Sequence, residues 1–309
     1  MKKVAISIGD LNGIGLEIAL KSHEKIKKYV KPIYCINREM LLQGANLLKI
    51  KIPNDFEIEE VEGNFEINPG KIDAKSGEYS FKSFQKAIKL AKENKVDAIT
   101  TLPIHKEAWN KAGIKYKGHT EVLRDIFKKN AIMMLGCPKM YVALFTEHIP
   151  LKEVANKVKK ENLIEFFINF YNSTNFKKIG VLGLNPHAGD GGVLGDEEIK
   201  EIIPAINEAN KILKKEIFYG PLVPDTAFNK KEGIFIAMYH DQGLAPLKAL
   251  YFDESINVSL NLPILRTSVD HGTAFDIAYK GIAKNKSYIN AIKYIKNWFI
   301  SIKNFSFLI

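Results

Sequence analysis

Short apolar runs alternate along the chain with longer stretches in which apolar residues recur every three or four positions. Val4–Ile8 is typical of a buried strand, and it leads through a Gly-rich loop into a helical pattern over Leu16–Tyr29. Helical periodicity returns over Phe81–Lys95, Asp196–Lys215 and Ser287–Lys303. This alternation predicts an α/β fold, in which crossover helices connect the strands of a parallel sheet.

Length and composition fit an ordinary soluble globular protein. At roughly 150 residues per domain, the 309 residues predict two domains. The net charge of +10 raises the possibility of nucleic-acid binding, but only three of the 45 basic residues are Arg, and the Lys are scattered. Because Arg is the usual reader of base edges and phosphates, we expect no nucleic-acid partner.

Cysteine usage and apolar run lengths exclude several other classes. Cys35 and Cys137 stand far apart and form no CxxC pair, so neither a zinc ribbon nor a disulfide framework is predicted. The apolar stretch at the N-terminus ends at Asp10, too soon for a signal peptide. No apolar run approaches the ~20 residues of a membrane span. We therefore expect a cytoplasmic protein without a membrane partner.

Four of the seven histidines follow an apolar, strand-like run: His105, His148, His187 and His240. Ligands of open parallel sheets bind at the carboxyl ends of the strands, so these imidazoles are candidates for a metal site. The alternative is that each caps a helix or is a satisfied buried residue. His23 lies in a Lys-rich amphipathic segment, and we expect it at the surface.

Three Gly-containing segments are candidate ligand loops. The first, Gly9–Gly15, lacks the GxGxxG spacing, and Cys35–Arg38, at the end of the next strand, hold no acidic residue such as a Rossmann fold would have there. This loop is either an anion cradle or a tight turn. The second, Asn185–Glu198, carries His187 and predicts a ligand contact. The third begins at Arg266, which indicates recognition of a carboxylate or phosphate, with a surface Arg beside a capped helix as the alternative.

Eight segments together resemble the 4-hydroxythreonine-4-phosphate dehydrogenase family. They are GDLNGIG (Gly9–Gly15), TLPIHK (Thr101–Lys106), GHTEVL (Gly118–Leu123), HIPL (His148–Leu151), LNPHAGDGG (Leu184–Gly192), GPLVPDTAF (Gly220–Phe228), YHDQGLAPLK (Tyr239–Lys248) and NVSLNLPILRTSVDHGTAFDIA (Asn257–Ala278). Their order matches that of the family. One departure is that Leu11 and Leu16 replace prolines of the family's first loop.

The resemblance implies two α/β domains with an active-site cleft between them, as in isocitrate and isopropylmalate dehydrogenases. We expect the first domain, on the cofactor side, to comprise residues 1–117 and 252–309, and the second, on the metal and dimer side, residues 118–251. The cofactor would be NAD, or NADP, bound without a Rossmann fold. Its predicted binding residues are Asp270, His271, Gly272 and Thr273.

The resemblance also implies the remaining site residues. One divalent ion (Zn, Mg or Co) would be bound by His148, His187 and His240. The phosphorylated substrate would contact His119, Thr120, Lys248, Asn257 and Arg266. The family forms homodimers with shared active sites, to which the second subunit contributes the histidine that corresponds to His240.

The implied reaction is oxidation of 4-phosphooxy-L-threonine at C3, followed by decarboxylation to 3-amino-2-oxopropyl phosphate in pyridoxal 5′-phosphate biosynthesis. Asp225 and Asp241 are the candidates for the catalytic base. Two alternatives stay open. One is a related dehydrogenase that acts on a phosphorylated sugar acid, such as phosphothreonate or phosphoerythronate. The other is a metal-dependent binding or hydrolytic protein on the same scaffold.

Overall fold

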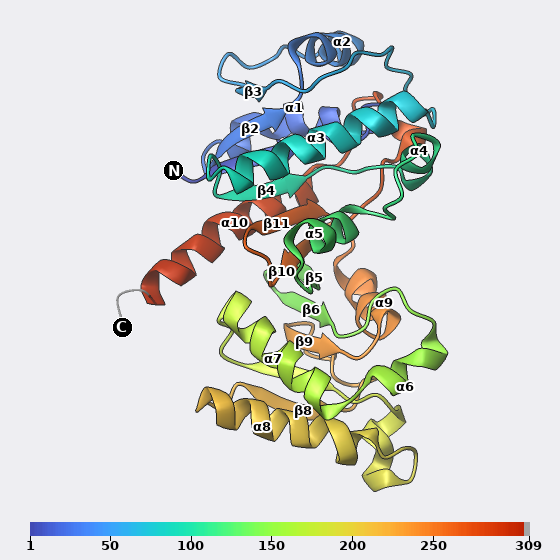
Figure 1. The fold of residues 1–309 in the computed structure, drawn as a ribbon, viewed down its shortest axis with the longest axis vertical. Coiled ribbons are helices and arrows are strands. Elements are labelled where there is room, and N and C mark those ends of the chain that lie inside the picture. The colour runs from blue at the N-terminus through green and yellow to red at the C-terminus, as the bar shows by residue number, and fades with distance from the viewer. Residues whose placement is uncertain (306–309) are drawn as a thin grey trace. The chain divides into compact units, whose positions relative to one another are not determined.

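The computed structural model describes residues 1–305, which form two compact α/β units (Figure 1). Unit 1 comprises Met1–Lys129, Ile256–Val258 and the chain from Leu262 onward, and unit 2 comprises Asn130–Ser255 and Ser259–Asn261. Residues 118–129, which were predicted for the second domain, cluster with unit 1, whereas residues 252–255 and 259–261, which were predicted for the first domain, cluster with unit 2. The predicted α/β class is confirmed.

Unit 1 is built on strands in the order β3-β2-β1-β4-β11-β10, of which β3, β2, β1, β4 and β11 pair in parallel. The strands are β1 (Lys3–Ser7), β2 (Lys31–Cys35), β3 (Ile58–Glu59), β4 (Ala98–Thr101), β10 (Ile256–Leu260), which has residues in both units, and β11 (Leu265–Val269). Val4, Ala5 and Ile6 of β1 are fully buried, because helices cover both faces of a sheet of this kind.

Three helices of unit 1 coincide with predicted helical segments, and the other helices of this unit were not predicted. The helices of unit 1 are α1 (Gly15–Ile26), α2 (Arg38–Leu48), α3 (Ala74–Lys92), α4 (Lys106–Lys111), α5 (His119–Phe127), the short η4 (Phe275–Ile277) and α10 (Lys286–Phe305). Helix α3 begins seven residues before the predicted start at Phe81. Its first turns bury the small residues Ser76, Gly77 and Ser80, which carry no apolar signal. A Cβ on Gly77 would lie 2.3 Å from the carbonyl oxygen of Ala108, so glycine lets α3 approach α4.

Unit 2 has a mixed sheet in the order β5-β6-β9-β7-β8, in which β5 and β6 are antiparallel and the other pairs parallel. The strands are β5 (Ile132–Cys137), β6 (Met140–Leu144), β7 (Ile179–Leu182), β8 (Phe218–Leu222) and β9 (Gly233–Ala237). Its helical segments are η1 (Leu151–Glu153), α6 (Val154–Lys157), α7 (Lys160–Thr174), η2 (Pro186–Gly192), η3 (Glu198–Ile202), α8 (Ile203–Leu213) and α9 (His240–Tyr251). Val142, Leu144 and Ala237 pack with Leu244 and Leu247 of α9, which fixes α9 on this sheet.

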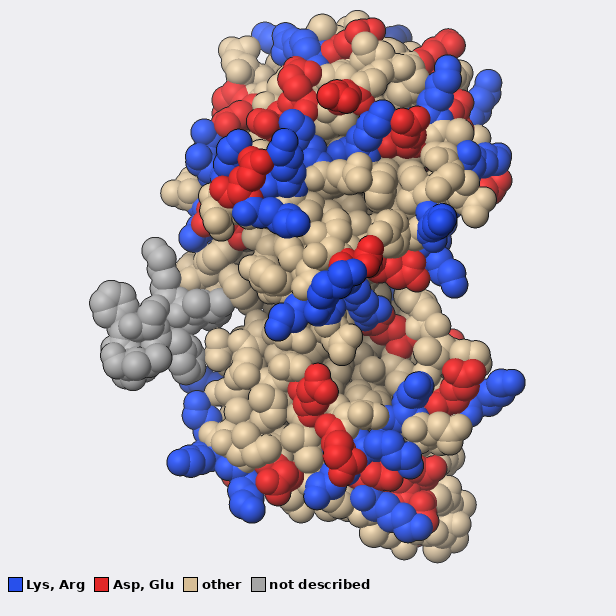
Figure 2. All heavy atoms as spheres, viewed as in Figure 1, with Lys and Arg blue, Asp and Glu red and all other residues tan. Residues whose placement is uncertain are grey.

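The surface carries both signs of charge. Lys and Arg lie intermingled with Asp and Glu over the face drawn in Figure 2. Among the described residues, no helix is long and apolar enough to cross a membrane.

Asn37, at the position where a Rossmann fold would have its acidic residue, is a helix cap. Its Oδ1 accepts a hydrogen bond from the backbone N–H of Met40 at 2.8 Å. Its Nδ2 donates to the carbonyl oxygens of Val61 and Gly63 at 2.9 and 2.8 Å. The side chain therefore joins the start of α2 to the segment after β3 and does not face a ribose.

We predict that Asn37→Ala lowers the free energy of unfolding by about 1–3 kcal/mol, because it removes the cap and leaves buried carbonyl groups without donors. Urea denaturation measures this loss. Asn37→Asp keeps the accepting oxygen and should lose less, whereas Asn297→Ala, at an exposed position of α10, is the matched control. Equal stability of Asn37→Ala and the control would contradict the capping role.

Candidate active site

Three of the four post-strand histidines follow adjacent parallel strands of unit 2. β9 pairs with β6 on one side and with β7 on the other, so the loops after these strands leave one edge of the sheet. His148 follows β6, His187 follows β7, and His240 is the first residue of α9 after β9. The sheet order thus places all three imidazole-bearing segments at neighbouring positions.

His148 and His240 are brought side by side. The loop after β6 continues the pairing with β9: Phe145 N donates to the carbonyl oxygen of Ala237 at 2.9 Å, and Thr146 Oγ1 to that of Met238 at 2.6 Å. The ring centroids of His148 and His240 are 5.4 Å apart, with the planes tilted by 43°. His240 Nδ1 also lies 2.6 Å from Oδ1 of Asp241.

His187 stands in a loop organised by a buried carboxylate. Glu198, 2% exposed, accepts hydrogen bonds from the backbone N–H groups of Leu184 and Asn185 at 2.7 and 2.8 Å. Residues 187–191 all have positive φ, a run that strongly favours glycine. A Cβ on Gly189 would lie 2.7 Å from Glu198 Oε2. The loop therefore has a defined conformation in which His187 is exposed. The sequence did not reveal that the Glu198 carboxylate holds this conformation.

The donor set at this edge fits a divalent ion. Imidazole is the commonest protein ligand for such ions, and a carboxylate on the second ring nitrogen, as Asp241 provides for His240, is the usual outer support. His148 and His240 are adjacent, while His187 belongs to the neighbouring loop. Among the described residues, the ligand atoms of these three histidines do not all lie within 4.8 Å of one another.

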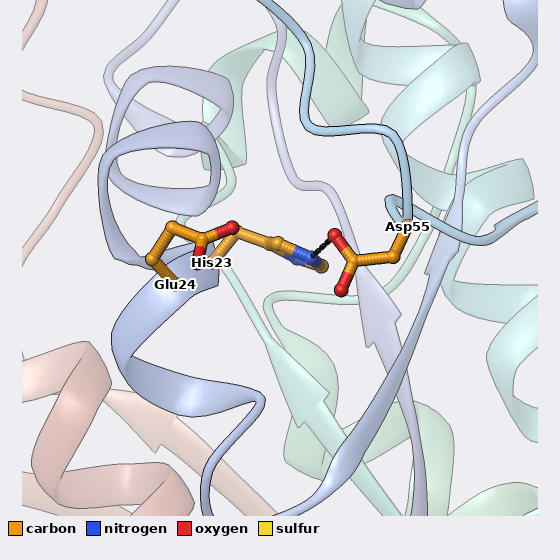
Figure 3. Close-up of side chains that lie close together, drawn as sticks. All are labelled: His23, Glu24 and Asp55. Carbon is orange, nitrogen blue, oxygen red and sulfur yellow. Dashed lines mark hydrogen bonds and ion pairs between the residues drawn. The ribbon is translucent and has the colours of Figure 1, made fainter.

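A different trio does meet that distance, in unit 1: His23, Glu24 and Asp55 (Figure 3). The Lys27 ammonium already lies 2.9 Å from a carboxylate oxygen of Glu24 and of Asp55. The His23 ring is 1% exposed, with Nδ1 bonded to Tyr34 Oη and Nε2 to Asp55 Oδ1. The prediction of a surface His23 is therefore wrong, because this face of α1 packs on the aromatic side chain of β2. The trio is an ion-pair network in which Lys27 supplies the positive charge.

The remaining predicted residues of unit 2 lie farther from this histidine edge. Lys248 is eight residues after His240 on α9, about 12 Å along the helix axis. Its Nζ lies 5.9 Å from the ring centroid of Phe252. Asp225 is exposed in the turn after β8, where Thr226 and Ala227 bond back to the carbonyl oxygen of Val223. Within the described residues, no hydrogen bond or ion pair joins the Asp225 carboxylate to the histidines.

Arg266 is buried within β11, 3% exposed, so the alternative of a surface Arg is wrong. The pairing of β11 with β4 aligns the two strands, and both Nε and Nη2 of Arg266 donate to Thr101 Oγ1, at 3.1 and 2.6 Å. Burial lowers the pKa of Arg266 to about 9. A guanidinium held in this way keeps its charge at neutral pH and suits a carboxylate or phosphate.

His119, at the start of α5, is a buried neutral imidazole. Its ring meets Phe84 and Trp109 edge-on, at centroid distances of 4.6 and 5.6 Å. Burial, together with the positive charge of Arg266, holds the pKa of His119 well below its usual range. The electrostatic coupling shows that the two predicted substrate residues lie near each other.

Two buried polar atoms of this region lack hydrogen-bond partners among the described residues: Nε2 of His119 and Oδ1 of Asn257. Buried polar atoms are nearly always bonded, so these two atoms are candidates for substrate contacts. Asn257 lies on β10, the neighbour of β11 in the sheet, and Thr120 follows His119 on α5. Unit 1 therefore contains four of the five predicted substrate residues.

The predicted cofactor loop rests on the first Gly-rich loop. Ile14 N donates to the carbonyl oxygen of Thr273 at 3.0 Å, and a Cβ on Gly13 would lie 2.9 Å from Thr273 Cβ. Asp270 N bonds Ser287 Oγ at 3.1 Å, and His271 Nδ1 lies 3.1 Å from the Gly272 carbonyl oxygen. These contacts fix the path of residues 270–273 at the carboxyl end of β11.

The amides of the first loop are used within the protein. Asp10 N donates to the Pro103 carbonyl oxygen, Asn12 N to Asp10 Oδ1, and Gly13 N to the Asp10 carbonyl oxygen, at 2.8–3.0 Å. Gly9 has φ of +74°, and a Cβ there would lie 2.3 Å from the Pro103 oxygen. The structure therefore favours the tight turn over the anion cradle.

Two further polar residues of unit 1 are Asp10, which the sequence did not single out, and His105, which it marked as a candidate metal ligand. Asp10 is fully buried; Ser76 Oγ donates to its Oδ1, Oδ2 has no partner among the described residues, and burial raises its pKa. His105 caps α4 and stacks on Phe275, with centroids 4.9 Å apart. His105 follows a strand, as the candidate metal ligands do, but in the structure it caps a helix, which was the alternative for these histidines.

We predict that His119 makes the protein less stable at acid pH. Because its folded pKa is lowered, only the unfolded chain binds this proton below about pH 6.5, and stability falls as the pH drops through that value. His119→Gln should show a shallower decrease between pH 7.5 and 5.5, measured by urea denaturation at each pH. Identical pH slopes in the two proteins would contradict the burial of a neutral imidazole.

Comparison with known proteins identifies the family. The family model described as "Pyridoxal phosphate biosynthetic protein PdxA" matches residues 28–295. The chain is 62% identical over 295 residues to the 4-hydroxythreonine-4-phosphate dehydrogenase of Sulfurimonas denitrificans, covering 94% of this chain and 96% of that relative. Identity to the Campylobacter fetus enzyme of the same name is 59%, over 95% and 97% of the two chains.

Solved structures agree with the sequence relatives. The crystal structure of 4-hydroxythreonine-4-phosphate dehydrogenase from Klebsiella pneumoniae superposes with a TM-score of 0.79 at 33% identity, over 95% of this chain and 96% of that one. A terephthalate 1,2-cis-dihydrodiol dehydrogenase from Burkholderia xenovorans shares the fold, with a TM-score of 0.69 at 24% identity over 96% and 97% of the chains. The predicted family resemblance is thereby confirmed, and the chain belongs to the PdxA family of pyridoxal phosphate biosynthetic proteins.

Proposed function

We propose that this chain is a dehydrogenase that oxidises 4-phosphooxy-L-threonine at C3 and yields 3-amino-2-oxopropyl phosphate after decarboxylation, in pyridoxal 5′-phosphate biosynthesis. The observation that carries the proposal is the near full-length identity of 62% to a relative named 4-hydroxythreonine-4-phosphate dehydrogenase. The relative shares the order and spacing of the whole chain rather than a single motif, which supports the same substrate. The site chemistry below is consistent with this assignment.

The substrate is anionic at its phosphate and carboxylate, and unit 1 offers a buried cation. Arg266, held by Thr101, would bind one of these groups through forked hydrogen bonds. Asn257 Oδ1 would accept from an ammonium or hydroxyl group, and His119 Nε2 and Thr120 would contact the same ligand. Lys248 would contribute a second positive charge from α9 of unit 2.

His148, His187 and His240 would hold the divalent ion, which is Zn, Mg or Co in this proposal. When bound, such an ion supplies Lewis-acid polarisation of a substrate oxygen. The chain's own contribution is to fix the imidazoles: Glu198 shapes the His187 loop, and Asp241 orients the His240 ring through Nδ1.

Asp270, His271, Gly272 and Thr273 would hold the nicotinamide cofactor, NAD or NADP, which would supply the hydride acceptor when bound. The first Gly-rich loop braces this segment through the Ile14–Thr273 hydrogen bond, so the segment is preorganised. Preorganised contacts reduce the ordering cost of cofactor binding.

One of the two predicted aspartates would remove the proton of the C3 hydroxyl. Asp241 contacts His240, which suits a role in orienting that ring. Asp225, in the exposed turn after β8 of the same unit, is therefore our preferred base.

The remaining parts of the proposal follow the family resemblance: the enzyme acts in the cytoplasm as a homodimer with shared active sites.

The first test is substrate oxidation by the purified protein with divalent ion and NAD or NADP. We expect reduced cofactor, followed at 340 nm, with 4-phosphooxy-L-threonine, and at least about a hundredfold lower kcat/KM with phosphothreonate or phosphoerythronate. Faster turnover of a phosphorylated sugar acid would replace the substrate assignment while keeping the dehydrogenase. No turnover of any of these acids would refute the proposal.

The second test concerns the ion. His187→Ala should weaken Zn²⁺ binding, measured by calorimetry, by about 10–100-fold or more and lower kcat by at least a similar factor, because one of three ligands is lost. Val193→Ala, at an 80% exposed position of the same loop, is the matched control. Glu24→Gln reports on the His23 network and should leave Zn²⁺ affinity unchanged. Undiminished binding in His187→Ala would remove this residue from the metal site.

A further inference from the structure

A surface hollow of about 330 Å³ lies in unit 1. Among the proposed site residues, those nearest to its lining in sequence are residues 270–273, which precede α10. The hollow is formed where the end of α1 and the segment after it pack against the first turns of α10. Its lining residues are Lys25, Lys28, Tyr29, Lys286, Ile289, Asn290 and Lys293. None of them is proposed to contact the substrate, the divalent ion or the nicotinamide cofactor.

The hollow is uniformly basic. Four of its lining residues are Lys and none is acidic. In the part of the chain that the structure describes, Lys25, Lys28 and Lys293 have no ion pair within 4.0 Å, whereas the adjacent Lys27 is paired with Glu24 and Asp55. Like charges that line one hollow repel one another, and a bound anion would relieve that repulsion.

An aromatic ring stands beside the ammonium groups. Nζ of Lys293 lies 5.6 Å from the ring centroid of half-buried Tyr29, and Nζ of Lys296 lies 5.2 Å from it. These cation–π contacts hold two flexible Lys side chains at one edge of the hollow. Lower side-chain mobility reduces the ordering cost of binding a multivalent anion.

The helix dipoles favour the lysines at the end of α1 but not the lysine at the start of α10. Lys25 and Lys28 stand at the C-terminal end of α1, where cations are favourable. Lys286 is the first residue of α10, at the positive end of that helix, where a cation is unfavourable. Both the N-terminal turn of α10 and its lysines attract negative charge, so the two helix ends converge on the same kind of ligand.

We propose that this hollow binds a small polyphosphate anion, either an inorganic polyphosphate or the polyphosphate chain of a nucleotide. Several adjacent phosphates would contact lysines from both helices at once. Lys binds phosphate as a point charge, and the hollow is compact, so a short flexible anion fits better than an extended nucleic acid. The site is separate from the one where we place the phosphorylated substrate.

The test uses the full chain and inorganic tripolyphosphate as the probe, with calorimetry at low and at physiological ionic strength. We expect one tripolyphosphate per chain and about tenfold weaker binding in Lys28→Gln/Lys293→Gln. The matched control is Lys92→Gln/Lys230→Gln, which removes the same charge from two exposed lysines elsewhere and should change the affinity less than about twofold. Circular dichroism checks that both double variants remain folded.

Additional binding experiments distinguish inorganic polyphosphate from a nucleotide and show which results would overturn the proposal. Adenosine triphosphate binding with similar affinity, without binding of adenosine, would show that the phosphates suffice; tighter triphosphate binding would favour a nucleotide. Equal losses in both double variants would reduce the effect to net charge and overturn the proposal. Binding unchanged in Lys28→Gln/Lys293→Gln would place the probe elsewhere, including the Arg266 site. Retention of the chain on DNA at physiological salt, without tripolyphosphate binding, would replace the proposal with a nucleic-acid surface.

Discussion

The position of β9 between β6 and β7 is the constraint on which the histidine edge depends. Parallel strands that pair side by side end at the same edge, so their following loops are neighbours whatever their sequence separation. The side chain of Gln242 strengthens this arrangement. Its Nε2 donates to the Gly183 carbonyl oxygen at 2.6 Å and its Oε1 accepts from Met238 N at 2.7 Å. One buried amide therefore links the end of β7 to the end of β9.

In unit 1 the main constraint is the burial of a charged side chain, Arg266. A buried guanidinium is costly unless polar partners surround it, and Thr101 supplies an acceptor for two of its nitrogens. The neighbouring imidazole of His119 is neutral, so it adds hydrogen-bonding capacity without a second positive charge. A site of this kind favours an anion with several polar groups over a simple counter-ion, as the proposed substrate requires.

The glycines show why the loops could be located in the sequence but not interpreted. Gly9, Gly13 and Gly189 each stand where a Cβ would strike another part of the chain: the Pro103 carbonyl, Thr273 or Glu198. A Gly-rich stretch predicts a turn, yet the atom that excludes the side chain comes from elsewhere in the fold. For this reason the first loop supports residues 270–273, the predicted cofactor segment, although its pattern was equally consistent with an anion cradle.

The sequence by itself determined the α/β class, four of the longer helices, the family and the four histidines that follow strands, because periodicity and local motifs depend on residues that are neighbours along the chain. It did not determine that His105 caps a helix while His148 and His240 lie together, since sheet order decides which strand ends are neighbours. The burial of His23 and Arg266 also came only from tertiary structure. Their segments look polar along the chain, and packing against other strands and helices is what removes these side chains from water.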